Sequence, residues 1–245
     1  MESFSNVIQP PADEVSDNDH PVKGHWHEKV FRNDNPIVLE LGCGKGEYTT
    51  GLAALVPDCN YVGVDIKGAR MWRGAKTSNE KNMSNVAFLR TRIEFITSFF
   101  ADDEVDEIWI TFPDPHPGGR HSNKRLTSPW YLNSYRMFLK NNGFIHLKTD
   151  NSELFEFTRK IIEANGLRLV FATTDLHSDN TRSELAEAFR NNSKGPVLSD
   201  SFADDILSIR THYEDMFIKN GSKINFLSFR LEKNKIIQYA ASKNC

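Results

Sequence analysis

The sequence predicts an α/β protein in which a mostly parallel sheet of seven strands carries helices on both faces. From residue 36 onward, short apolar segments alternate with longer stretches of helical periodicity. The connections between them are short, so each helix can return the chain to the start of a neighbouring parallel strand. A chain of 245 residues can bury one large core.

Each strand and helix is predicted from its own stretch of sequence. Segments such as IVLEL and NYVGVD are apolar and β-rich, and a glycine or proline ends most helical stretches. Strands are expected at residues 37–41, 60–65, 86–90, 105–112, 144–148, 168–173 and 223–231. Helices are expected at residues 45–55, 67–81, 93–100, 130–139 and 152–165. Ligands of such sheets bind where the strands end, so we sought functional residues there.

The domain organisation follows from composition. Residues 1–22 are polar, acidic and proline-containing, which predicts a flexible arm. Residues 23–245 are expected to form a single domain. Within it, residues 178–200 are interpreted as an insertion with a short helix, and we assign it no function.

Charge and composition exclude several classes of protein. The chain has 30 Lys and Arg against 33 Asp and Glu, which excludes a strongly basic nucleic-acid binder but allows a local basic patch. Three cysteines without metal spacing, and histidines without convincing partners, predict no metal site. Neither a signal peptide nor an apolar run of membrane-spanning length is visible, so a soluble cytoplasmic protein without a membrane partner is expected. Monomer and homodimer both remain open.

A glycine-rich loop after the first strand predicts a cofactor site. Gly42 and Gly44 begin a GxGxG motif, but Glu47 stands where a dinucleotide-binding loop has its third glycine. A carboxylate there would repel a pyrophosphate, which favours a cofactor without phosphates such as S-adenosylmethionine. Asp65 ends the second strand and can accept both ribose hydroxyls, and Glu40 precedes the glycines beside the expected amino-acid end.

A proline-rich loop follows the fourth strand. In Phe112-Pro113-Asp114-Pro115 the prolines restrict the backbone, which would hold Asp114 over the reactive methyl group. The segment 118–125 carries three positive charges and no acidic residue, a pattern that suits contact with phosphates. The residues expected to make this contact are Arg120, Lys124 and Arg125.

Two further features point to a nucleic-acid substrate. Asp150 follows the fifth strand and either caps the next helix, a role open also to Asn151 and Ser152, or accepts hydrogen bonds from the Watson–Crick edge of guanine. The helix after Asp65 carries a spiral of positive charge that we interpret as facing RNA. Its members are Lys67, Arg70, Arg73 and Lys76.

Taken together, these motifs resemble the tRNA (guanine-N7)-methyltransferase family. The resemblance is carried by VLELGCGKGEYT, YVGVDIKGARMWRGAK, DEIWITFPDP, RLTS, GFIHLKTDN and a later THYE, and it spans residues 24–173 and 205–231. It implies a Rossmann-like class I methyltransferase domain, S-adenosylmethionine as methyl donor and a variable-loop guanosine of tRNA as acceptor. By the same resemblance, cofactor binding is implied for Glu40, Gly42, Gly44, Asp65 and Asp114. Substrate contact is implied for Asp150, Thr211 and Glu214.

Thr211-x-x-Glu214 also fits a helix capping box, as does Thr181-x-x-Glu184 outside the resemblance. The sequence departs from the family at Gly118-Gly119, where many members have lysine, and at His116, where many have tryptophan. Many members also have an acidic residue near the adenine amino group. Here the neighbouring positions hold Arg92 and Glu94, and the adenine contact stays unassigned.

Guanine N7 carries an in-plane lone pair, so no general base is needed, and positioning can supply most of the catalysis. Asp114 or Asp150 would stabilise the purine as it becomes cationic.

Two alternative functions remain. The first is a methyltransferase for another RNA, a small molecule or a protein side chain, and the second is a catalytically weak RNA-binding protein of this fold. Glu47 makes an NAD oxidoreductase the least favoured assignment.

Overall fold

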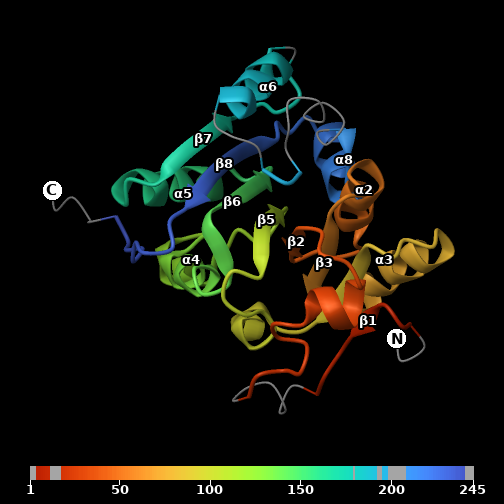
Figure 1. Ribbon diagram of the computed structural model, residues 1–245. Helices are drawn as coiled ribbons and strands as arrows, with labels where there is room; N and C mark the ends of the chain where they lie inside the picture. Colours follow the sequence, from red (N-terminus) through yellow and green to blue (C-terminus); the bar gives the residue numbers. More distant parts are fainter. Residues whose placement is uncertain (1–3, 12–17, 179, 192–194, 198–207, 241–245) are drawn as a thin grey trace, which may run out of the picture.

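The computed structural model describes residues 4–11, 18–178, 180–191, 195–197 and 208–240. One eight-stranded sheet runs through the molecule, in the order β1-β4-β3-β2-β5-β6-β8-β7 (Figure 1). All neighbouring pairs are parallel except those of β8, which runs antiparallel to both β6 and β7. The predicted α/β architecture with a mostly parallel sheet is therefore confirmed, with one strand more than expected.

The strands are β1 (Val7–Ile8), β2 (Ile37–Leu41), β3 (Asn60–Asp65), β4 (Val86–Arg90), β5 (Val105–Thr111), β6 (Leu139–Thr149), β7 (Arg168–Thr173) and β8 (Asn225–Leu231). The α-helices are α2 (Glu47–Leu55), α3 (Gly68–Glu80), α4 (Pro129–Tyr135), α5 (Ser152–Ala164), α6 (Thr181–Asn191) and α8 (His212–Lys219). Tighter or wider helical turns are η1 (Trp26–Phe31), η2 (Ile93–Ser98) and η3 (Gly119–Lys124).

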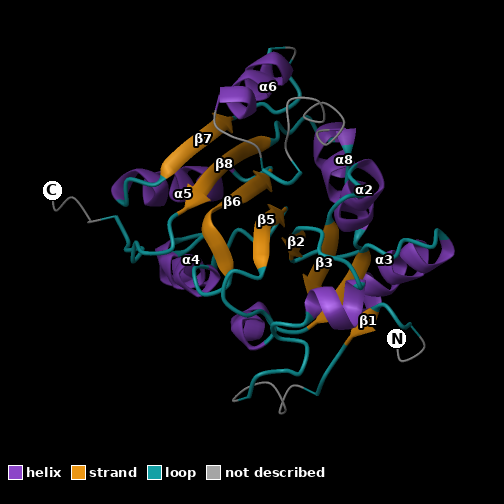
Figure 2. Ribbon diagram, viewed as in Figure 1, coloured by secondary structure: helices purple, strands orange, loops and turns teal. Residues whose placement is uncertain are grey.

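Helices cover both faces of the sheet, as Figure 2 shows. Successive residues of a strand point to opposite faces, so Leu39 belongs to one apolar cluster and Val38 to the other. The first cluster includes buried residues of η1, η2, α4 and α5, and the second includes buried residues of α2, α3 and α6. Because both faces are covered, the central strands are mostly apolar, with buried exceptions such as Glu40 in β2.

Two expectations about chain segments need correction. Val7 and Ile8 lie in the predicted arm, yet they pair with Phe88 and Leu89 of β4 and add the eighth strand. The predicted helix 130–139 is too long: α4 ends at Tyr135 and β6 already begins at Leu139, where it pairs with Val105 before a register shift. In both cases pairing with a distant strand outweighs the local pattern.

The segment 178–200 contains a short helix, as predicted. In α6, Leu185 and Phe189 are buried in the second apolar cluster. The expected cap is wrong, because the Thr181 hydroxyl donates to the Asp175 carbonyl while the Glu184 N–H donates to the Asn180 carbonyl. Residues 179, 192–194 and 198–200 of the predicted insertion, and 1–3 and 12–17 of the predicted arm, lie outside the described residues.

The glycine-rich loop is held against the sheet by contacts around Phe88. A side chain at Gly46, Gly63 or Gly74 would begin within 2.8 Å of the Phe88 ring. At Gly74 on α3, it would also begin 2.8 Å from the Lys45 carbonyl oxygen of the loop. The loop and the helix therefore approach each other at backbone distance, which only glycine permits.

We expect Gly74→Ala to disturb both stability and cofactor binding. The added methyl group has no room, so α3 or the loop must shift, at a cost of about 1–3 kcal/mol in the free energy of unfolding. Chemical denaturation measures this loss, and calorimetry with S-adenosylmethionine should show weaker binding. Ala69→Ser, at an exposed position of the same helix, should leave stability within about 0.5 kcal/mol. Wild-type stability and affinity in Gly74→Ala would contradict this account.

Candidate active site

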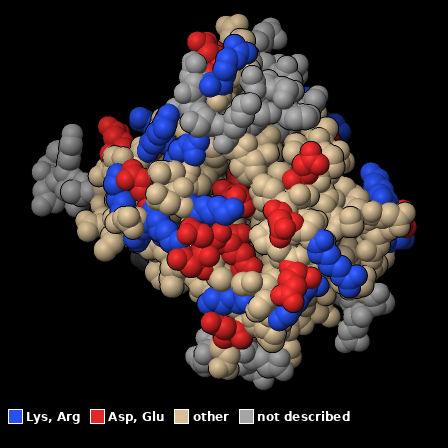
Figure 3. Space-filling view, in the orientation of Figure 1, with Lys and Arg blue, Asp and Glu red and all other residues tan. Residues whose placement is uncertain are grey.

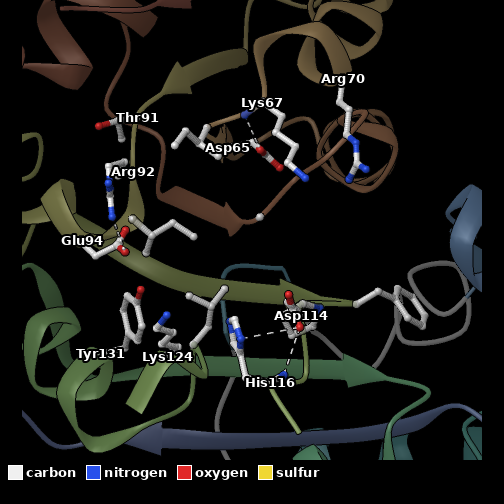
Figure 4. A pocket seen from close by; sticks show the side chains of 16 residues that line it. Asp65, Lys67, Arg70, Thr91, Arg92, Glu94, Asp114, His116, Lys124 and Tyr131 are labelled. Carbon is white, nitrogen blue, oxygen red and sulfur yellow. Dashed lines mark hydrogen bonds and ion pairs between the residues drawn. The ribbon is translucent and has the colours of Figure 1, made fainter. Parts of the chain in front are cut away.

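Two adjoining cavities lie where the parallel strands end. Their volumes are about 480 Å³ and about 450 Å³. Residues that line both are Gly42, Asp65, Lys67, Arg70, Phe112, Pro113 and Asp114. Shared walls make the two cavities one cleft. Figure 4 shows the first cavity, with Asp65 and Lys67 across from Asp114 and His116.

Asp65 connects the end of β3 to the glycine-rich loop. One carboxylate oxygen accepts the Gly44 N–H at 2.9 Å, and the other accepts the Lys67 N–H at 2.7 Å. The positive φ angles of Gly42 and Gly44, 79° and 54°, let the loop turn back toward this carboxylate. The partly exposed Asp65 side chain thus lines the cleft from a well-held position.

Glu40 lies deeper and lines the second cavity. It is only 3% exposed. Its carboxylate accepts hydrogen bonds from the N–H and hydroxyl of Thr49 and from the Thr111 hydroxyl. Burial raises the pKa of Glu40 to about 7, and the negative charge of Asp65 acts in the same direction. This carboxyl group can therefore gain or lose a proton near neutral pH.

Asp114 and Asp150 approach the second cavity from neighbouring strands, β5 and β6. The Asp114 side chain is 71% exposed and accepts the His116 N–H at 3.1 Å. Asn151, one of the residues considered for the cap of α5, takes that role by accepting the Leu154 N–H at 2.8 Å. Asp150 is therefore not engaged as a cap, and burial raises its pKa above the ordinary value.

Thr211 and Glu214 are placed differently from each other. Thr211 caps α8 by accepting the Glu214 N–H at 3.1 Å, and it also lines the second cavity. Glu214 is fully buried, and its carboxylate contacts Lys148 Nζ at 2.8 Å and His177 Nε2 at 2.9 Å. Burial favours a higher pKa for Glu214, but these two partners outweigh it and hold the pKa below the ordinary value. Glu214 itself lines neither of the two cavities. It affects the cleft only by anchoring α8, the helix on which it lies.

The basic residues that the sequence suggested for contact with RNA also differ from one another in exposure. Lys124 is exposed and lines the first cavity, and Lys67 and Arg70 line both cavities. Arg125 is only 3% exposed and lies against the Pro115 carbonyl, so its burial does not support the predicted phosphate contact. The side chain of Arg120 lies outside what the structure describes. On the face in Figure 3, basic and acidic side chains are interspersed.

Lys148 and His177 are site-supporting residues that sequence reasoning missed. Lys148 follows FIHL in the buried second half of β6, and burial lowers its pKa although Glu214 opposes the shift. A lysine in a buried stretch of strand requires a partner, which was the available signal. Near the expected adenine end, Arg92 pairs with Glu94 at 3.3 Å and Tyr131 lines the same cavity. Burial raises the pKa of Tyr131 to about 12.

Comparison with known proteins identifies the family. A family model described as "Putative methyltransferase" matches residues 34–227. The tRNA (guanine-N(7)-)-methyltransferase of Bacteroides fragilis is 47% identical over 94% of this chain and 82% of its own. That of Lachnoclostridium phytofermentans is 37% identical over 89% of this chain and 94% of its own. The chain belongs to the tRNA (guanine-N7)-methyltransferase family.

Solved structures support the fold of this methyltransferase. An antibiotic-related methyltransferase aligns with a TM-score of 0.55 and 16% identity, covering 83% of this chain and 91% of the other. The 16S rRNA methyltransferase KamB aligns with a TM-score of 0.53 and 14% identity, covering 87% and 95%. At such identities the likeness concerns the fold alone, and it confirms the predicted class I methyltransferase architecture.

S-adenosylmethionine is the cofactor of the methyltransferase, and the cleft has suitable groups for it. Asp65 offers carboxylate oxygens beside the glycine-rich loop, and Glu40 offers a buried carboxyl group beside the same loop. A cationic sulfonium and an ammonium group both suit acidic walls.

None of the helices in the described part of the chain has the length and hydropathy that crossing a bilayer requires.

We expect S-adenosylmethionine binding to release a proton from Glu40. Cationic groups of the cofactor favour the ionised carboxylate, so affinity should rise as pH increases through about 7. Calorimetry in buffers of different ionisation enthalpy measures the released proton. Glu40→Gln should reduce the release, and equal release by both proteins would contradict the assignment. The raised pKa also means that the contribution of Glu40 to stability falls as pH rises from 4.5 through about 7, because the unfolded state loses this proton first.

Proposed function

We propose that this methyltransferase transfers the methyl group of S-adenosylmethionine to N7 of a guanosine in the variable loop of tRNA. The observation that carries the proposal is the convergence of Asp114, Asp150 and the glycine-rich loop on one cavity. The printed names of relatives as much as 47% identical support the tRNA substrate and the N7 position. We further propose that residues 23–245, together with β1 at the edge of the sheet, act as one catalytic domain and that the enzyme works in the cytoplasm, where a tRNA substrate is available.

When bound, S-adenosylmethionine supplies a methyl group on a cationic sulfur. We assign Glu40, Gly42, Gly44 and Asp65 to holding its amino-acid and ribose parts, with Asp114 beside the methyl group. No residue needs to remove a proton from the guanine, because N7 presents a free lone pair. The protein's task is to hold that atom in line with the methyl group, which can supply up to about 7–11 kcal/mol of the barrier.

Asp150 is assigned to the guanine. Its carboxylate can accept hydrogen bonds from N1–H and the exocyclic amino group, and this contact strengthens as the purine becomes cationic. Phe112 and Phe217 add an aromatic wall to the same cavity, with ring centroids 5.7 Å apart, against which a base can pack. Thr211, at the start of α8, lies on the wall that also holds Phe217 and is assigned to substrate contact.

Contact with the tRNA backbone is assigned to the exposed cations around the cleft. Lys67 and Arg70 begin the basic side of α3, and Lys124 lies across the first cavity. Arg120 remains an assignment from the sequence. Such contacts release counterions, so tRNA affinity should fall steeply with salt.

The deciding experiment incubates the protein with unmodified tRNA and labelled S-adenosylmethionine and then analyses the nucleosides. We expect 7-methylguanosine. Asp150→Ala should lower kcat/KM by about 10²–10³-fold, because a charge-stabilising contact is lost, while cofactor affinity stays near wild type. Glu156→Gln, at a carboxylate on the outer side of the adjoining helix α5, is the control and should keep wild-type turnover.

Absence of 7-methylguanosine would overturn the proposed function. Label on a different nucleoside would indicate another RNA methyltransferase, and tRNA binding without transfer would indicate a catalytically weak RNA-binding protein. Near-normal turnover in Asp150→Ala would overturn the role assigned to that carboxylate.

A further inference from the structure

Arg125 is a buried cation at the end of the basic segment 118–125, whose other described side chains are exposed or partly exposed. Its neighbour Lys124 is exposed and lines the first cavity, whereas only 3% of Arg125 is accessible to solvent. A buried charge is tolerated in proteins only when it is paired and hydrogen-bonded, so the partners of this guanidinium indicate what it does.

The guanidinium contacts two different segments of the chain. On one side, Nε donates to the Pro115 carbonyl at 3.0 Å, and Nη2 donates to the His116 carbonyl at 3.2 Å. On the other side, Nη2 pairs with the carboxylate of Glu153, in the first turn of α5. The Phe157 ring, one turn further along α5, lies 4.6 Å from the guanidinium carbon.

Each of these segments carries one of the two carboxylates assigned to the reaction. Pro115 directly follows Asp114, and Glu153 lies three residues after Asp150. The Gly118 N–H also donates to Glu153, at 3.4 Å, which adds a second contact between the loop and the helix. A single side chain therefore links the backbone beside Asp114 to the helix that begins beside Asp150.

The loop needs such support because its backbone is strained. Phe112 and His116 both adopt positive φ angles, 48° and 42°, in the region that residues other than glycine rarely occupy. Conformations of this kind persist only where the surroundings hold them. The carbonyl of His116, one of the two strained residues, is an acceptor for Arg125.

We propose that Arg125 is a positioning residue that sets the placement of Asp114 relative to Asp150 and does not contact tRNA phosphate. The proposal rests on the proposed methyl transfer to guanine N7. A phosphate would have to compete with Glu153 for the guanidinium and reach a side chain with almost no exposed surface. Misplacement of reacting groups by about 1 Å can cost about 10²-fold in rate, so loss of this link should act on turnover.

Arg125→Lys is the discriminating variant. A lysine can replace arginine at a phosphate. Its compact ammonium group cannot replace the planar guanidinium group here, which donates to two carbonyls and a carboxylate at once. We expect kcat for tRNA methylation to fall about 10- to 100-fold, with KM and the dependence of tRNA affinity on salt unchanged. Arg125→Gln should behave in the same way.

Lys124→Gln is the matched comparison, because it removes one positive charge from the exposed neighbour. Here the slope of log affinity against log salt should become shallower by the amount that corresponds to losing about one contact with a tRNA phosphate. A shallower salt slope in the Arg125 variants, or wild-type kcat in Arg125→Lys, would overturn the positioning role.

Glu153→Gln keeps the proposal testable if the Arg125 variants do not fold, because Glu153 is more than half exposed. Its kcat should fall in the same direction by a smaller factor. Where both proteins fold, adding Glu153→Gln to Arg125→Gln should cost less than the two single effects combined, since they break the same link. Wild-type kcat in Glu153→Gln would count against the link.

Amide hydrogen exchange provides a readout that is independent of methylation. In Arg125→Gln or Glu153→Gln, the segment 112–118 should exchange faster than in wild type, whereas the backbone of β3, which β2 separates from β5, should not change. Unchanged exchange in 112–118 would overturn the proposal. If the wild type forms no 7-methylguanosine but the exchange difference is present, the proposed function fails while the link itself stands.

Discussion

The candidate site depends on how closely three stretches of backbone pack around the ring of Phe88. At Gly46 in the loop, Gly63 in β3 and Gly74 in α3, a Cβ atom would lie within 2.8 Å of this ring, so none of the three positions has room for a side chain. The helix can therefore lie directly against the loop, and the loop turns toward Asp65 at the end of β3. The position of the cleft thus follows from this steric fit together with the hydrogen bond that the Asp65 carboxylate accepts from the loop.

Buried charges then connect the walls of the cleft to the sheet. Lys148 on β6 pairs with Glu214 and thereby anchors α8, whose cap and aromatic residues line the second cavity. Arg125 connects the loop after β5 to α5 through Glu153. Removing the partner of Lys148 or of Arg125 leaves an uncompensated buried charge, so these pairs hold their segments in defined places. Such segments are where catalytic geometry needs rigid support.

Prediction from the sequence succeeded where a segment's own pattern determines its structure. The bounds of β2, β3, β4 and β7 agree with the expected strands, because apolar β-rich runs flanked by turn residues are decided locally. It failed for β1 and for the start of β6. Val7–Ile8 is too short to carry a periodic pattern, and Leu139 joins the sheet because Val105 is there to pair with it.

The candidate site likewise has features that the local sequence determines and features that only tertiary contacts determine. The sequence alone determined that Asp65 ends a strand and that Asp114 and Asp150 each follow one, and parallel strands bring such residues to one edge of a sheet. The tertiary structure decided which charged residues are buried. Arg125 and Glu214 look like exposed polar residues within their own segments. Their partners come from α5, β6 and the turn after β7, 28 to 66 residues away, and only folding brings those charges together.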